Sequence, residues 1–203
     1  GYVALPVQRE RHTLYPVIQG STIKGVLRDE MKARKPAGRS AEDHDQEVAK
    51  VFGSEDAKTP GSVAFGDGVL VAFPVRSTGA PFHWVTSPFA LERVCRLLGG
   101  PLDLAPAPER GEALAKSGGE VLLEELFARK VESPLLLRGK DGQPAPLEVL
   151  LDLLPPAARG FAYTRSVFLD RLLVVSDDDF QELVETATEV VTRIKLNGLG
   201  TTE

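Results

Sequence analysis

Apolar and polar positions follow two different periods along the chain, and these periods predict helices and strands in mixed order. Apolar residues return every three or four positions, as in amphipathic helices, in four segments: 21–35, 42–52, 88–98 and 177–189. Short apolar or alternating runs bounded by Gly, Pro or Ser predict strands at 2–8, two within 62–76, 82–86, 172–176 and 190–196. Residues 120–131 are a weaker strand candidate, and 147–154 a short helix. Such mixing predicts an α+β fold in which helices cover a sheet.

The first predicted helix is the most informative element. Gly20 permits a turn into it, and a hydroxyl of Ser21 or Thr22 can accept a bond from a free amide at its start. Helical spacing predicts a buried stripe, formed by Ile23, Val26, Leu27 and Met31. A second stripe is basic, formed by Lys24, Arg28, Lys32 and Lys35. Free amides and a row of cations suit the phosphates of a polyanion, although a solvated surface helix has the same pattern.

The charge distribution favours the binding interpretation. The chain has a formal net charge of -5, yet its first 40 residues have a net charge of +5. The remaining 163 residues have a net charge of -10. A basic segment on an otherwise acidic chain is typical of a nucleic-acid-binding face.

Composition limits the protein class further. With 203 residues and 42% hydrophobic content, the chain can bury a substantial core. The single cysteine, Cys95, excludes an internal disulfide and fits a cytoplasmic location. The apolar run 69–75 is too short to span a membrane, so no membrane partner is expected. The sequence begins inside a strand-like pattern and ends abruptly at Glu203. We therefore expect a fragment of a longer protein, or a chain with parts omitted.

Two groups of titratable residues are candidates for chemistry. His12, beside the basic helix, could act as a general base, or it could position a strand by one hydrogen bond. Asp177, Asp178 and Asp179 could bind a divalent metal, but carboxylates after Ser176 are also what a capped helix start favours. Neither pattern alone selects the catalytic interpretation. Trp84 lies with His83 in a strand-like run, so Trp84 is expected in the core, and His83 has no partner pattern that indicates chemistry.

The sequence resembles a known family over two regions. The first contains Val3–Thr13, the motif Gly20-Ser21-Thr22-Ile23-Lys24-Gly25-Val26-Leu27-Arg28, and shorter matches to residue 95. The second is Val174–Phe180, followed by Glu189–Ile194. Both resemble the backbone subunit of the type III-B CRISPR effector, the Cmr complex, in the repeat-associated mysterious protein (RAMP) superfamily. The match is weak between residues 100 and 165.

The resemblance implies a fold and a set of partners. It implies one RAMP domain over 1–203 with a ferredoxin-like core of the RNA-recognition type, a variable insertion at about 99–167 and a β-hairpin thumb at about 190–203. Implied partners are guide RNA, target RNA, further copies in a stacked filament and other effector subunits. The RNA-contacting positions would be Arg9, Arg11, Gln19, Ser21, Thr22, Lys24, Arg28 and Lys32. The thumb stem would include Val191, Thr192, Arg193, Ile194 and Lys195.

One position departs from the family. The resemblance implies a catalytic aspartate, acting with a divalent metal and no tightly bound cofactor, where this chain has Ala4. A methyl group neither accepts a proton nor binds a metal. We therefore expect an endoribonuclease subunit that binds target RNA without cutting it, through either engineered inactivation or a naturally silent site. Two alternatives remain: an architectural RNA-binding subunit that was never a nuclease, and an unrelated metal enzyme that uses Asp177–Asp179.

Overall fold

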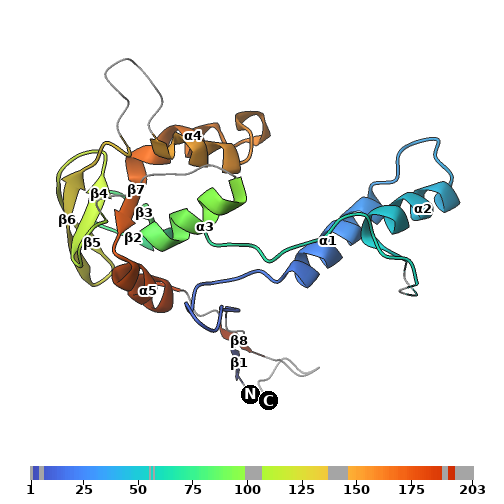
Figure 1. The fold of residues 1–203 in the computed structure, drawn as a ribbon, viewed down its shortest axis with the longest axis horizontal. Coiled ribbons are helices and arrows are strands. Elements are labelled where there is room, and N and C mark those ends of the chain that lie inside the picture. The colour runs from blue at the N-terminus through green and yellow to red at the C-terminus, as the bar shows by residue number, and fades with distance from the viewer. Residues whose placement is uncertain are drawn as a thin grey trace. The chain divides into compact units, whose positions relative to one another are not determined.

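A computed structural model describes residues 2–4, 7–54, 56, 58–98, 107–136, 146–188 and 192–194. The chain divides into two compact units (Figure 1). Unit 1 comprises Gly1–Pro16 and Leu70–Glu203, and unit 2 comprises Val17–Val69. Both helices and strands are present, so the α+β class is confirmed.

Unit 1 is built on a curled six-stranded sheet. Its strands, in spatial order, are β2 (Phe73–Arg76), β3 (Phe82–Thr86), β7 (Leu172–Val175), β4 (Glu112–Ala115), β6 (Leu126–Glu132) and β5 (Gly119–Leu123). The β3–β7 and β4–β6 pairs are parallel, and the other neighbours are antiparallel. The sheet curls far enough for its two outer strands to meet at one corner. There Ser77 bridges to Leu123, and the Thr78 amide donates to the Leu122 carbonyl oxygen at 3.0 Å.

Helices cover both faces of this sheet. On one face, α5 (Asp177–Thr186) buries Phe180, Leu183 and Val184 against the sheet. On the other, α3 (Pro88–Leu98) packs with the 3-10 helix η1 (Pro146–Leu153). Figure 1 shows α3 beside the sheet with the short helix α4 (Ala162–Val167), which lies between the 3-10 turns η2 (Ala157–Arg159) and η3 (Leu169–Arg171). The result is two apolar cores separated by one sheet.

Unit 2 is a pair of helices, α1 (Gly20–Ala33) and α2 (Ala41–Phe52). Ser40 caps α2 by accepting a bond from the Asp43 amide. The helices are joined by a hydrogen bond between His44 Nε2 and the Met31 carbonyl oxygen, 2.9 Å apart. Beyond α2, a Cβ on Gly61 would collide with the Val51 carbonyl oxygen, so this close backbone approach requires glycine.

Several predicted elements need correction. The strand predicted before β2, within 62–72, is absent from the described residues of that range, where Gly68 makes only an isolated bridge to Ile18. No strand is predicted between residues 99 and 119, yet Glu112–Ala115 form the buried strand β4. Its Ala and Leu residues show too little alternation to be distinguished from a loop by sequence. The weak candidate at 120–131 is a clear hairpin, β5–β6.

A second, two-stranded sheet pairs a strand near the start of the chain with a strand near its end. Strand β1 (Tyr2–Ala4) pairs antiparallel with β8 (Thr192–Ile194), so Ala4 lies opposite Thr192. The hairpin predicted beyond residue 194, with Lys195, and the stem residue Val191 lie outside the described residues. Within the described part of the chain, no helix is both long and apolar enough to cross a bilayer.

Asp179 provides a test of how α5 is fixed to the sheet. Its carboxylate is buried and accepts from the Gly111 amide at 2.8 Å and from Arg110 Nε at 3.2 Å. Asp179→Ala leaves that amide without its partner and is expected to lower the free energy of unfolding by about 1–3 kcal/mol in urea titration. The exposed neighbour Asp178 is the matched control. Asp178→Ala is expected to change stability by less than about 0.5 kcal/mol, and equal losses in both variants would contradict this role.

Candidate nucleic-acid interface

The start of α1 is organised differently from the sequence prediction. The helix begins at Gly20, and its amide donates to Asp67 Oδ1 at 2.7 Å. Ser21 and Thr22 therefore lie exposed within the first turn and do not cap it, so their predicted capping role is wrong. The Thr22 amide donates to the Gln19 carbonyl oxygen at 2.9 Å. The helix start already has a carboxylate beside it, which reduces its attraction for a phosphate.

Asp67 is a residue that sequence analysis missed. It lies between Gly66 and Gly68, in the segment 62–76 for which the sequence predicts two strands and no contact with the helix. A Cβ on Gly20 would lie 2.5 Å from the Phe65 carbonyl oxygen, so glycine allows the loop of Asp67 to approach the helix. A carboxylate distant in sequence can cap a helix without any local signal, and only the tertiary contact reveals it.

The apolar stripe of α1 is less buried than its spacing predicts. Val26 and Leu27 are 64% and 45% exposed, and Ile23 and Met31 are half-buried. The prediction of one buried stripe is therefore wrong for Val26 and Leu27. Periodicity identifies a helix with an apolar face, but not whether its own unit covers that face.

The basic stripe divides into residues with different roles. Arg28 Nη2 donates to the Gly53 carbonyl oxygen at 2.7 Å, at the end of α2. This bond fixes the guanidinium between the two helices. Arg28 and Lys32 line a pocket of about 260 Å³ with Ser54 and three residues of α2. Lys24 is half-buried on the same helix.

A second group of candidates forms a compact loop in unit 1. Arg9 bridges to Pro16, and the Glu10 amide donates to the Tyr15 carbonyl oxygen at 2.9 Å. Tyr15 is buried, with its ring 5.0 Å from that of Phe180 and edge-on to it. The loop is therefore fixed at its base by an aromatic side chain in the core.

Arg9 has a structural role in this loop. Its Nη1 donates to the Leu14 carbonyl oxygen at 2.8 Å and its Nη2 to Thr188 Oγ1 at 2.5 Å. Thr188 lies just after α5, so Arg9 fixes the loop to the segment that leads to β8. Arg11 and His12 are exposed on the same loop. His12 Nε2 lies 3.8 Å from Glu10 Oε2.

Glu10 is the electrostatic centre of the loop and was not predicted to be one. Arg93 of α3 donates to it twice, with Nη1 at 2.9 Å from Oε2 and Nη2 at 2.5 Å from Oε1. Hydrogen bonding by Arg93 lowers the pKa of Glu10, with a further contribution from Thr13, although burial opposes the shift. The Arg93 pKa is raised by the same partner. No sequence pattern connects positions 10 and 93.

Ala4 and the thumb stem are brought together by β1–β8 pairing. Ala4 lies opposite Thr192, Arg193 opposite Val3 and Ile194 opposite Tyr2. The position where the family resemblance implies a catalytic aspartate is therefore on a strand paired with the predicted stem. The RNA-contact candidates of α1 belong to unit 2, and Arg9, Arg11 and His12 belong to unit 1.

Two of the three aspartates proposed as an alternative metal site, Asp177 and Asp179, have other partners. Asp177 Oδ1 accepts from the Phe89 amide at 3.0 Å, at the start of α3. Asp179 is bonded to Gly111 and Arg110, as described above. Across the described ranges, no three His, Cys, Asp or Glu side chains come together in a group that could hold a metal ion. His83 is likewise held in the fold, since Nδ1 lies 2.6 Å from Ser77 Oγ and burial lowers its pKa.

Comparison with known proteins identifies the family. The family model described as the RAMP superfamily matches residues 3–203. The chain belongs to the RAMP superfamily. The CRISPR system Cmr endoribonuclease Cmr4 of Pyrococcus furiosus is 34% identical over 216 residues, covering 100% of this chain and 67% of that protein. The resemblance to the Cmr backbone subunit is thereby confirmed.

Solved structures agree with this RAMP assignment. A Cmr4 crystal structure has a TM-score of 0.64 and 29% identity, over 92% of this chain and 68% of the other. The crystal structure of oligomeric Cmr4 from Pyrococcus furiosus has a TM-score of 0.65 and 27% identity, over 93% of this chain and 73% of that one. The sheet and helices described above therefore have the arrangement of a RAMP protein.

The Glu10–Arg93 pair predicts a pH effect on stability. Because the Glu10 pKa is lowered in the folded chain, its stabilising contribution is complete above the ordinary glutamate pKa of about 4.3 and is lost as pH falls through the folded value. Glu10→Gln is expected to lower unfolding free energy at pH 7 by about 1.5–3 kcal/mol. The variant and the parent chain should converge in stability towards acid pH in urea titrations. A constant difference down to acid pH would contradict this assignment.

Proposed function

We propose that this RAMP protein is a backbone subunit of a type III-B CRISPR effector that binds guide RNA, stacks with further copies of itself and positions target RNA without cutting it. The observation that carries the proposal is the similarity of the whole chain to a Cmr endoribonuclease. It is combined with the position of Ala4 on β1, which pairs with β8 of the predicted thumb stem. Other effector subunits would then be its protein partners, and the cytoplasm its location.

The strand order supports a ferredoxin-like core for this function. Along the chain, β3, α3 and β4 follow one another, and β7 and α5 come later. In the sheet, β3 and β7 lie side by side and parallel. Strand β4 lies antiparallel beside β7, and β2 lies antiparallel beside β3. This is the arrangement of a split β-α-β unit, with β2 in the place of the last strand. The thumb would then be the segment that continues from β8.

Lys24 is the clearest candidate for guide contact on α1. Arg28 also stabilises the helix pair through Gly53, so its loss would combine folding and binding effects. Lys24 lies one turn earlier on the same helix. A cation there would neutralise a phosphate of the RNA backbone and would not distinguish one RNA sequence from another. Exposed Arg11 and His12 would contact the RNA from unit 1.

Ala4 determines the expected chemistry. Cleavage through a 2′-hydroxyl requires a group that accepts its proton or orients it, and a methyl group does neither. The architectural alternative shares every binding residue and differs only in whether position 4 can support cutting.

The first test concerns guide binding. Lys24→Ala should weaken binding to single-stranded RNAs of different sequence alike, and should reduce the slope of log affinity against log salt by about 0.7. Fluorescence anisotropy across a salt series measures both quantities. Lys50→Ala, which removes one exposed cation from α2, is the matched control and should change neither. If Lys24→Ala and the parent chain have equal affinity and equal salt slope, the interpretation of α1 as a solvated surface helix would be favoured.

The second test restores the missing carboxylate. Ala4→Asp should create cutting of paired target RNA at regular intervals in the presence of Mg²⁺, with the guide left intact. Guide affinity should change little, because position 4 contributes no cation. In the Ala4→Asp background, His12→Ala should reduce cutting less than a return to alanine at position 4, a loss expected to be about 10²–10⁴-fold. A variant that binds target normally and never cuts would support the architectural alternative.

A further inference from the structure

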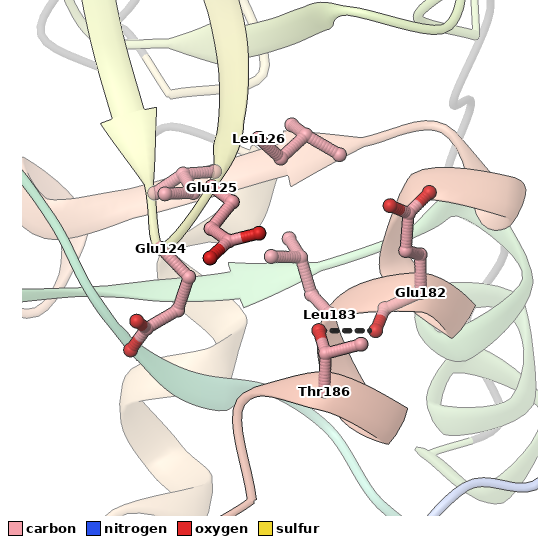
Figure 2. Close-up of a pocket in the computed structure, with 7 residues that line it drawn as sticks. Glu124, Glu125, Leu126, Glu182, Leu183 and Thr186 are labelled. Carbon is pink, nitrogen blue, oxygen red and sulfur yellow. Dashed lines mark hydrogen bonds between the residues drawn. The ribbon is translucent and has the colours of Figure 1, made fainter.

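A small pocket lies between the β5–β6 turn and α5 in unit 1, and none of the candidate RNA contacts lines it. Its volume is about 240 Å³, and it is lined by Leu123, Glu124, Glu125, Leu126, Glu182, Leu183 and Thr186. Figure 2 shows carboxylates from the turn and from α5 on either side of leucine side chains. Leu123 and Leu183 are buried parts of the core, so the floor of the pocket is apolar.

The three carboxylates around this floor are not equivalent. Glu124 Oε2 lies 2.9 Å from Arg76 Nη2, and Glu182 Oε2 lies 2.9 Å from Arg110 Nη2. Glu125 is exposed, and no described residue pairs with its carboxylate. Glu124 has a φ of +52°, which turns the chain so that Glu125 follows on the pocket side (Figure 2). The pocket therefore has one carboxylate available to an incoming group.

The combination of an apolar floor and an acidic rim selects the class of occupant. A nucleic-acid phosphate would be repelled by the carboxylates. The volume is below the range of about 300–1,000 Å³ that is usual for small-molecule sites. Lysine and arginine side chains have an apolar stem and a charged end, so one such side chain can contact the leucines and pair with Glu125 at once.

The chain itself contains a segment with the matching chemistry. The loop between α1 and α2 contains Arg34, Lys35 and Arg39 and no acidic residue, and all of its residues are exposed. Arg34 pairs with Glu30 and Arg39 with Glu47. Lys35 has no partner among the described residues. It is thus the cation of this loop that is available to another molecule.

We propose that Lys35 of one copy enters the pocket of a second copy and pairs with Glu125, which makes a head-to-tail contact between subunits. The contact rests on the self-association included in the proposed function. It joins two different surfaces, so each copy keeps one donor loop and one acceptor pocket free for the next copy. A heterologous contact of this kind extends without closing, unless the rotation between subunits forms a ring.

Zero-length carbodiimide crosslinking tests the contact directly. Isotopically heavy and light full-length protein are mixed, crosslinked with and without single-stranded RNA, and digested for mass spectrometry. The carbodiimide activates the Glu125 carboxylate, and the Lys35 amine then attacks the acyl carbon and releases the reagent as a urea. The expected product is an amide between Lys35 and Glu125. It should appear in mixed heavy–light pairs. Lys35–Glu125 links found only within one isotope class, or no such link in assembled protein, would overturn the proposal.

Charge reversal gives an independent measurement. Glu125→Lys and Lys35→Glu should each weaken self-association by about tenfold or more in sedimentation velocity, and the double reversal should recover most of that loss. Glu120→Lys changes an exposed carboxylate on β5 outside the pocket and is the control. The contact would be overturned if both single variants assembled as the parent chain does. It would also be overturned if the double variant, with a normal thermal midpoint, failed to recover self-association.

RNA anisotropy on the same variants separates this contact from the proposed function. Normal RNA binding with unchanged assembly in both single variants would reject only the pocket contact. If the parent chain does not bind RNA but still forms the Lys35–Glu125 crosslink, only the proposed RNA-binding function would be rejected. A parent chain that stays monomeric with and without RNA would reject the contact, whatever its affinity for RNA.

Discussion

Burial of β7 on both faces is the constraint on which unit 1 depends. All four residues of Leu172–Val175 are buried, and they alternate between the two cores. Leu173 and Val175 contact the core under α5, whereas Leu172 and Val174 contact the core under α3 and η1. A central strand that is apolar on both sides requires a cover on each face, so the position of the helices follows from this strand.

The same strand also fixes the polar connections around it. Ser176 follows β7 directly and caps α5 by accepting from the Asp179 amide at 3.1 Å. The Asp179 carboxylate then holds the backbone just before β4, and Asp177 accepts from the start of α3. An acidic run that resembles a metal site is therefore used to connect three elements. Carboxylates near helix starts stabilise the helix dipole as well, so these residues have a sufficient structural explanation.

Local patterns predicted most of the helices and the central strands. Ser176 precedes the helix that the sequence predicted from residue 177, and its side chain caps α5. The failures involve partners distant in sequence: Asp67 caps α1, Arg93 holds Glu10, and Gly53 accepts from Arg28. β4 was missed because its short Glu-Ala-Leu-Ala run has no strand signature of its own. For the candidate site, the sequence predicted a helix that carries a basic stripe, and the structure contains that helix, but the sequence did not reveal which of its cations are committed to folding. The departure at Ala4 stays a prediction.

The corner where β2 meets β5 has a consequence for how such a protein can associate. The outermost strand of an open sheet offers unpaired amides and carbonyls, which invite a strand from another molecule. Here the Thr78 amide bonds to the Leu122 carbonyl, and the Glu124 amide bonds to the Arg76 carbonyl at 3.0 Å. The two outer strands thus satisfy part of each other's backbone at this corner, which protects it against edge-to-edge aggregation. Neighbours that approach there must recognise side chains, which vary with sequence, and not the backbone, which every protein shares.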